Sequence, residues 1–408
     1  MRPCSGATGS PEHKRMPLTG CLARIDARDA EVRGWAWLDR TATGGEGPLA
    51  GLVVGAKDVI DVAGMPTTHG SPIYAGNVAT ADAEAVARLR AAGAVVLGKT
   101  VTAEFATYHP GPTANPRNLA HTPGGSSSGS AAVVADGQAD IALGTQTAGS
   151  MIRPASFCGT LAFKPTLGRY PLGGVLETSP TLDTLGVFAR NLAVLSAADA
   201  VLSGDGAQPA VPAILTVGLC RSPAWDEASV EMQGTFLRFA DRLRAAGHTV
   251  FDRTLPQPFD RLRAAQALIH RREAAACVGH IRRDHPAEVS AEFIAMIDEG
   301  AGESEAAYQA ALALLRECKA LSEEVFAGVD LLLVPGATGA APAGLAATGN
   351  PAFQRIWTAI GVPCFGFPAE WQDDGLPLGL QVIAAPGGDR QLLFDATAIV
   401  ALATLREN

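Results

Sequence analysis

Serine and glycine crowd residues 124–159, a stretch with almost no charge and no histidine. It begins GGSSSGS, and a second glycine-rich patch, TAGSMIRP, contains Ser150. A serine hydroxyl becomes a nucleophile only when a neighbouring base accepts its proton. The stretch therefore suggests acyl-transfer chemistry with a base from elsewhere in the chain. The ordinary alternative is a pair of loops that turn the chain or bind an anion at a helix N-terminus.

Residues 125–129 also fit the G-x-S-x-G pattern, which would make Ser127 the nucleophile with a later histidine as its base. That motif needs a strand directly before it. The preceding residues, ANPRNLAHTP, include two prolines, which disfavour a strand. We therefore disfavour this interpretation. A Ser-x-x-Lys nucleophile is excluded, because no lysine follows a serine at that spacing.

Lys57 stands in the apolar run GLVVGAKDVIDVAG and is one of only five lysines. Most lysines are solvated at the surface, and lysine is rarely buried without a partner. The apolar neighbours of Lys57 favour burial. Burial lowers the pKa of a lysine, so that its amine can be neutral near pH 7 and act as a base. Lys57 would then supply the base that the serine-rich stretch lacks.

The elements that would position these residues alternate between strands and helices. Buried strands are predicted at 51–57, 94–100, 330–336 and 378–385. A helix is predicted over 80–93, with Thr80 as its N-cap and Gly93 just past its end. This alternation predicts an α/β fold, with a large mixed, mostly parallel β-sheet covered by helices on both faces.

The 408 residues, 47% of them hydrophobic, are enough for a large core. We expect a loose tail over 1–20 and a single domain over 21–408, with a helix-rich insertion at about 220–330. The net charge of −9 disfavours nucleic acid and membrane surfaces as partners. The N-terminus lacks the apolar segment of a signal peptide, and no apolar run is long enough to span a membrane. The seven scattered cysteines form no CxxC, which argues against a disulfide framework or a zinc site. We expect a cytoplasmic protein.

Several ordered blocks of this sequence resemble the amidase signature family. They are Lys57-Asp58 after a buried strand, GGSS at 124–127, GTQTAGSMIRPASFCG, FKPTLGR, SPTLDTLG and GLPLGLQVIAAPGGD. The resemblance covers about residues 20–400, is weakest over 200–330, and is closest to short malonamidase-like and carboxybiuret hydrolase-like members. It implies the amidase signature fold and a Ser-cisSer-Lys triad that needs no metal or organic cofactor.

The resemblance assigns roles by position. Ser150 would be the nucleophile, Ser126 the bridging serine after a cis Gly125–Ser126 bond, and Lys57 the base. Lys57 would deprotonate Ser126, Ser126 would deprotonate Ser150, and Ser150 would attack an amide carbonyl to form an acyl-enzyme. The oxyanion hole would be formed by the backbone N–H groups of Thr147, Ala148, Gly149 and Ser150. The glycine suits converging donors, which need unusual backbone angles.

Three side chains near the triad are predicted to bind substrate: Gln146, Ser127 and Arg153. Arg153 follows Ser150 by three residues, and malonamidase-like members use an arginine there to bind a carboxylate. An arginine can clamp a carboxylate through two hydrogen bonds. The alternative role for Arg153 is a structural ion pair. Cys158 lies among apolar residues and is expected to be packed core.

We therefore expect a hydrolase for a small amide substrate, with a carboxylate-bearing, malonamate-like molecule as the main candidate. One alternative is an amidotransferase A-type subunit that releases ammonia from glutamine for a partner. Another is a broad aryl or alkyl amidase that includes urea- or carbamate-type substrates. A homodimer is left open. A non-catalytic binding module is disfavoured by the intact Lys57, Ser126 and Ser150.

Overall fold

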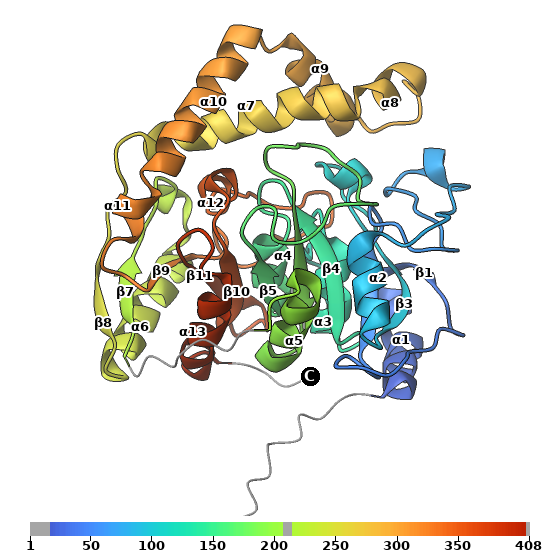
Figure 1. The fold of residues 1–408 in the computed structure, drawn as a ribbon, viewed down its shortest axis with the longest axis horizontal. Helices are drawn as coiled ribbons and strands as arrows, with labels where there is room; N and C mark the ends of the chain where they lie inside the picture. Colours follow the sequence, from blue (N-terminus) through green and yellow to red (C-terminus); the bar gives the residue numbers. More distant parts are fainter. Residues whose placement is uncertain (1–16, 207–213, 405–408) are drawn as a thin grey trace, which may run out of the picture.

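A single twisted β-sheet forms the centre of the molecule (Figure 1). The structure is a computed structural model that describes residues 17–206 and 214–404. The strands are β1 (Trp35–Leu38), β2 (Val53–Lys57), β3 (Val95–Thr100), β4 (Ile141–Gln146), β5 (Leu161–Lys164), β6 (Thr184–Ala189), β7 (Thr216–Leu219), β8 (Thr249–Asp252), β9 (Leu331–Pro335), β10 (Cys364–Trp371) and β11 (Pro377–Ile383). They form one eleven-stranded sheet in the order β1-β3-β2-β4-β6-β5-β10-β11-β9-β7-β8.

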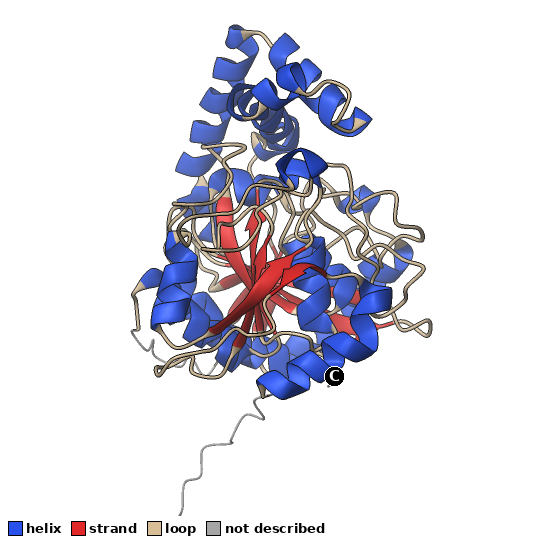
Figure 2. Ribbon diagram, turned by 90° about the vertical axis from the view of Figure 1, so that its right-hand side faces the viewer, coloured by secondary structure: helices blue, strands red, loops and turns tan. Residues whose placement is uncertain are grey.

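Helices cover both faces of this sheet (Figure 2). They are α1 (Leu18–Val32), α2 (Glu84–Ala91), α3 (Ser128–Ala135), α4 (Ile152–Cys158), α5 (Leu192–Ser203), α6 (Val230–Ala245), α7 (Phe259–Cys277), α8 (Gly279–Asp284), α9 (Ala291–Gly302), α10 (Glu305–Ala320), α11 (Ser322–Phe326), α12 (Arg355–Ile360) and α13 (Asp389–Ala401). Because the central strands are covered on both sides, they are buried along their whole length, as in VVGAK of β2. The predicted α/β class is confirmed.

The sheet is mixed, as predicted, but it is not mostly parallel. Parallel pairs join β2 to β3 and β4, and β7 to β8 and β9. The remaining neighbours, β1–β3, β4–β6, β5–β6, β5–β10, β10–β11 and β9–β11, are antiparallel. The expectation failed partly because β10 and β11 are joined by a short turn, and only antiparallel strands can be connected in this way.

The first predicted helix begins later than expected. Its N-cap is Ala83 rather than Thr80, and the helix α2 starts at Glu84. The carboxylate of Asp82 instead accepts a hydrogen bond from the N–H of Ala63, at 2.8 Å, and pairs with Arg90. The predicted end is confirmed, because Gly93 has a φ of +94°.

A cap of helices lies over one end of the sheet. In Figure 1, α7, α8, α9 and α10 lie together at the top of the molecule, above the sheet. These helices fall within the predicted insertion at about 220–330, but so does β8, which extends the main sheet. The domain boundaries themselves stay a prediction, and most of the predicted tail lies outside the described residues.

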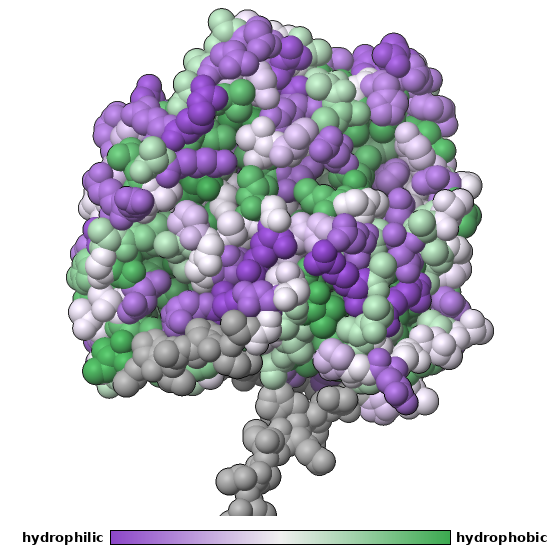
Figure 3. Space-filling view, viewed as in Figure 1, coloured by the Kyte–Doolittle hydropathy of each residue, from purple (hydrophilic) through white to green (hydrophobic). Residues whose placement is uncertain are grey.

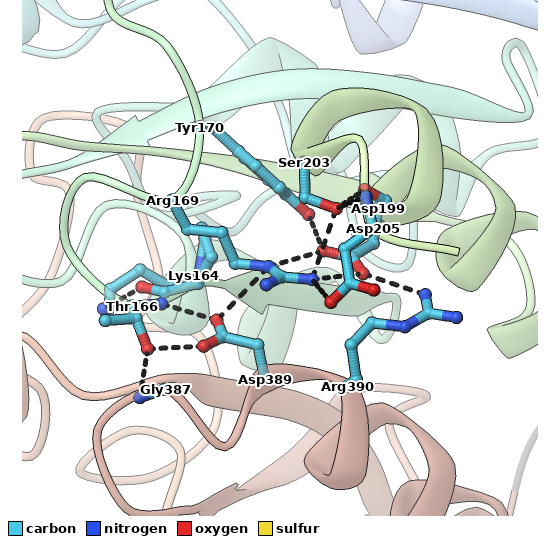
Figure 4. A network of polar contacts seen from close by, with 11 residues as sticks. Lys164, Thr166, Arg169, Tyr170, Asp199, Ser203, Asp205, Gly387, Asp389 and Arg390 are labelled. Atoms are coloured by element: carbon cyan, nitrogen blue, oxygen red, sulfur yellow. Dashed lines mark hydrogen bonds and ion pairs between the residues drawn. The ribbon is translucent and has the colours of Figure 1, made fainter. Parts of the chain in front are cut away.

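A buried polar network joins the segment after β5 to two helices (Figure 4). Asp199 of α5 has no exposed surface and accepts hydrogen bonds from Arg169, Tyr170 and Arg390 of α13. The Tyr170 hydroxyl donates to Asp199 at 2.7 Å. Because a buried carboxylate without partners is costly, these contacts fix how α5 and α13 sit against the sheet.

Candidate active site

The three residues of the predicted triad come from adjoining elements. Lys57 is the last residue of β2, Ser126 precedes α3, and Ser150 lies in the loop between β4 and α4. Since β2 and β4 are parallel neighbours, their carboxyl ends meet at the same edge of the sheet. This pairing brings the lysine and the nucleophile loop to one place.

The amine of Lys57 is completely buried and contacts two hydroxyl groups. Its Nζ lies 2.8 Å from Oγ of Ser126 and 2.7 Å from Oγ1 of Thr145. No carboxylate within 4 Å forms an ion pair with it in the described residues. Burial lowers the pKa of Lys57 to about 7, and the charge of Asp183 opposes that shift. The predicted burial and the contact with Ser126 are therefore present in the structure.

The Gly125–Ser126 peptide bond is cis, as the resemblance implied. Gly124, just before it, has a φ of +81°, and a Cβ there would lie 2.9 Å from Cα of Pro154. Only glycine meets both demands at this position. The carbonyl oxygen of Gly125 accepts a hydrogen bond of 2.6 Å from Arg153.

The loop of residues 147–150 is held by its carbonyl oxygens. Gln266 of α7 donates to the carbonyl of Thr147 at 2.9 Å, and Thr358 of α12 donates to that of Ala148 at 2.7 Å. The N–H groups of Ala148, Gly149 and Ser150 have no partner in the part of the chain that the structure describes. Unpaired N–H groups beside a nucleophile are what an oxyanion hole requires.

Gly149 is needed for space rather than for an unusual φ, which corrects the sequence-based reason. Its φ is not positive. A Cβ at this residue would lie 2.8 Å from Cβ of Pro351 and 2.9 Å from Oε1 of Gln354. Any larger residue would therefore push the loop away from the segment that leads into α12.

Two side chains that were predicted to bind substrate, those of Gln146 and Ser127, make hydrogen bonds to other groups of the protein. Gln146 donates to Thr358 at 2.9 Å and accepts from the first free N–H groups of α4, those of Met151 and Ile152. Ser127 exchanges hydrogen bonds of 3.2 and 3.3 Å with the backbone of Thr145. Both side chains are fully buried, so the contacts they make hold the two loops together.

Arg153 does not form the ion pair that was the alternative to substrate binding, within the residues that the structure describes. Its Nη atoms donate to the carbonyls of Gly125 and Gly349 and to the hydroxyl of Thr348, and it forms no ion pair among the described residues. Burial and the neighbouring charge of Arg355 lower its pKa. The prediction of a structural ion pair is thus wrong. The binding of a substrate carboxylate by Arg153 stays a prediction. Cys158 is buried as predicted, and burial raises the pKa of its thiol.

A family model described as Amidase matches residues 14–393. The chain belongs to the amidase family. Its relatives include the A-type subunit of glutamyl-tRNA(Gln) amidotransferase from Koribacter versatilis, 31% identical over 439 residues, with 88% of this chain and 89% of that protein covered. The corresponding protein of Methanosarcina mazei, which has the same name, is 47% identical over 167 residues, which are 40% of this chain and only 35% of the relative. The solved structure of 6-aminohexanoate cyclic dimer hydrolase with its substrate has a TM-score of 0.83 and 26% identity, with 95% of this chain and 93% of that chain covered.

The amidase-family site contains a buried carboxylate that the sequence analysis did not assign. Asp183 accepts hydrogen bonds from the hydroxyl of Thr147 and from the N–H groups of Thr178 and Ser179, the latter two at 2.7 and 2.8 Å. Burial raises the pKa of Asp183. The signal was present, because the aspartate lies in the quoted block SPTLDTLG.

A cavity of about 250 Å³ lies beside Thr145, the hydroxyl partner of Lys57. It is lined by Ala106, Thr145, Thr147, Leu172, Val175, Leu176, Glu177, Thr178 and Asp183. Thr145 contacts the lysine, and Thr147 begins the nucleophile loop. Four of these nine residues are apolar and five are polar, and two of the polar ones, Glu177 and Asp183, carry carboxyl groups. In the described residues, no group of histidine, cysteine or acidic side chains could hold a metal ion, and no helix is apolar over enough residues to cross a bilayer.

Proposed function

We propose that this chain hydrolyses a small amide through an acyl-enzyme on Ser150. The observation that carries the proposal is the 2.8 Å contact between the buried Nζ of Lys57 and Oγ of Ser126. A neutral amine at this place has a lone pair that can accept the Ser126 proton. Ser126 in turn accepts the proton of Ser150 as that oxygen attacks the amide carbon.

The carbonyl oxygen of the substrate becomes negative when Ser150 adds to it. The unpaired N–H groups of Ala148, Gly149 and Ser150 support the proposal that this charge is stabilised by the loop. The C–N bond then breaks, and the leaving amine takes the proton back through Ser126. Water repeats the sequence on the acyl-enzyme and releases the acid.

The second candidate is release of ammonia from glutamine for a partner enzyme. It is favoured by the names of the relatives, which are A-type subunits of an amidotransferase. The aligned 439 residues exceed this 408-residue chain, so the Koribacter relative contains segments that this chain lacks. The two candidates share the attack on a carboxamide and differ in what receives the ammonia.

Fewer observations bear on which amide is the substrate than on the reaction itself. The malonamate-like substrate was predicted from Arg153, whose Nη atoms already donate to three protein oxygens. The apolar part of the 250 Å³ cavity, formed by Ala106, Leu172, Val175 and Leu176, suits an aryl or alkyl amide, and the carboxyl groups of Glu177 and Asp183 in the same wall do not favour an anionic substrate. We therefore base the proposal on the reaction and not on a named substrate.

The test is ammonia release by the purified chain from glutamine, malonamate, propionamide and an aryl amide. Ser150→Ala and Lys57→Ala should lower kcat/KM by roughly a thousandfold or more, and Ser126→Ala by about a hundredfold or more. Ser127→Ala is the matched control, because its hydroxyl contacts only the backbone of Thr145 and the sulfur of Met151. Full activity in Ser150→Ala with loss in Ser127→Ala would overturn the assignment.

A further inference from the structure

The helix α7 presents a polar face to the nucleophile loop. Arg263, Gln266, His270 and Glu273 follow one another at spacings of three, four and three residues, which places them on one side of the helix. Gln266, His270 and Glu273 are buried. A polar stripe on the buried side of a helix is unusual, and each of its members should have a partner.

Three of these four side chains have one. Arg263 pairs with Glu227 at 2.6 Å, and Gln266 donates to the carbonyl of Thr147. Glu273 accepts from Ser179, from Thr181 and from Tyr308. The stripe thus binds α7 to the main body on both sides of His270.

His270 alone lacks a partner. Its side chain is 3% exposed, and neither ring nitrogen has a hydrogen-bond partner among the described residues. Its ring lies 6.4 Å from that of Tyr108. Burial, with the charges of Arg355 and Arg271, lowers its pKa to about 3, so the imidazole is neutral and offers one N–H donor. A buried polar group left unpaired in this way destabilises the fold.

Positive charge without a matching acid surrounds the same place. Arg355, at the start of α12, donates to Oε1 of Gln266, and it forms no ion pair in the described residues. The charge of Arg355 reaches both His270 and Arg153. Arg153 is likewise without an ion pair, and its Nε has no partner among the described residues. Arg153 is buried and Arg355 is partly exposed, and neither has an acidic partner among the described residues. An anion would therefore complete the contacts of this group.

We propose that Arg355 and His270 bind a carboxylate of the amide substrate beside the nucleophile loop. The guanidinium would donate to the carboxylate through charge-assisted hydrogen bonds, and the imidazole N–H would add a third donor. Gln266 accepts from Arg355 and donates to Thr147, three residues before Ser150, and so connects the proposed carboxylate site to the loop that contains the proposed nucleophile. The proposal rests on the proposed function for the reaction that it serves.

Equilibrium binding tests the site without catalysis. Succinate and malonate are titrated calorimetrically into the wild-type chain, Arg355→Gln, His270→Leu and the control Arg316→Gln, an exposed arginine of α10. We expect Kd to rise at least tenfold in the first two variants and to stay unchanged in the control. His270→Leu keeps the bulk of a side chain whose nitrogens have no partner, so its Tm should not fall. Equal binding by all four proteins would overturn the proposal.

Kinetics with matched substrates separates this proposal from the proposed function. Succinamate carries a carboxylate where succinamide carries a second carboxamide, and initial rates are compared because hydrolysis of succinamide releases succinamate. The ratio of their kcat/KM values should fall about tenfold or more in Arg355→Gln and His270→Leu, mainly through KM of succinamate. Hydrolysis of both amides with an unchanged ratio would refute the carboxylate site and leave the proposed reaction intact. Binding of succinate through Arg355 without hydrolysis of any amide would refute the proposed reaction and leave the carboxylate site intact.

Discussion

At the scale of single residues, the proposed chemistry depends on the protonation state of Lys57. An ordinary lysine is protonated at neutral pH and cannot accept a proton. Here the amine is buried between two hydroxyl groups with no ion-paired acid in the described residues, and burial outweighs the charge of Asp183. The same burial that makes Lys57 a base must also destabilise the folded chain whenever the lysine is protonated. Both consequences can be measured.

The rate should follow the deprotonation of Lys57. Its pKa is about 7, so kcat/KM should rise through this pH and reach a plateau at mildly alkaline pH. Below pH 6 the value should fall by about tenfold for each unit. The measurement is a pH profile with a neutral amide, whose own charge stays constant. A profile that is flat from pH 5 to 9 would contradict a lysine base.

Lys57→Met should abolish activity and stabilise the fold at neutral pH. The pKa of Lys57 lies near 7 in the folded chain and near 10.5 in the unfolded one. Between these values the unfolded chain binds more protons, so the stability of the wild-type protein rises with pH through this window. The gain from methionine, on the order of a few kcal/mol, should be full below pH 7 and fade towards pH 10. Denaturant unfolding at pH 6, 8 and 10 gives the difference, and a constant gain would argue against a depressed pKa.

The sequence predicted the burial of Lys57, whereas it did not single out one serine as the nucleophile. The apolar neighbours of Lys57 were enough to suggest burial, because they form the strand β2. By contrast, nothing local distinguishes Ser150 from Ser126 or Ser127, and that choice came from the resemblance. Gln266 reaches the loop at 147–150 from the distant helix α7, so no local pattern could place it there.

At the scale of elements, the paired ends of β2 and β4 and the loop at 147–150 form the centre of the site. The buried strands were predictable from their short apolar runs. The relative direction of neighbouring strands could not be predicted in this way, because it depends on connections such as the turn between β10 and β11. The predicted start of α2 was also wrong. The carboxylate of Asp82 accepts a hydrogen bond from the N–H of the distant Ala63 and not from the first turn of α2.

Gln266 positions the nucleophile loop from α7, and its loss should affect turnover. Gln266→Leu removes the hydrogen bond to the carbonyl of Thr147, which orients the unpaired N–H groups that follow. We expect kcat to fall about tenfold and the free energy of unfolding to fall by about 1 kcal/mol. Gln309→Leu on the exposed side of α10 serves as the control. A change in Tm with unaltered kcat would assign Gln266 a purely structural role.

At the scale of the whole molecule, the charge of −9 and the mixed surface set the expectations about partners. Hydrophobic residues are interspersed with hydrophilic ones over the face seen in Figure 3. The family shared with amidotransferase subunits leaves open whether this chain works alone.

The purified chain should hydrolyse an amide by itself, and a chelator should not inhibit it. The reason is that a lysine base and backbone N–H donors supply the chemistry proposed here. Ammonia release is measured before and after dialysis against EDTA, with the molecular mass determined by light scattering in the same buffer. Activity that is lost on dialysis and restored by a divalent ion would contradict the mechanism. Activity that needs a co-purified polypeptide would favour the amidotransferase alternative.

The polar face of α7 separates two tasks along the chain. The proposed base, relay and nucleophile all lie within residues 57–150, whereas His270 and Arg355 lie on α7 and α12, more than a hundred residues later. With His270 and Arg355 as the proposed carboxylate ligands, substitutions at these two positions would change substrate preference, while Gln266 and Thr358 on the same helices keep the loop at 147–150 in place. In the history of the family, the same separation would let one reaction be redirected to new amides in small steps.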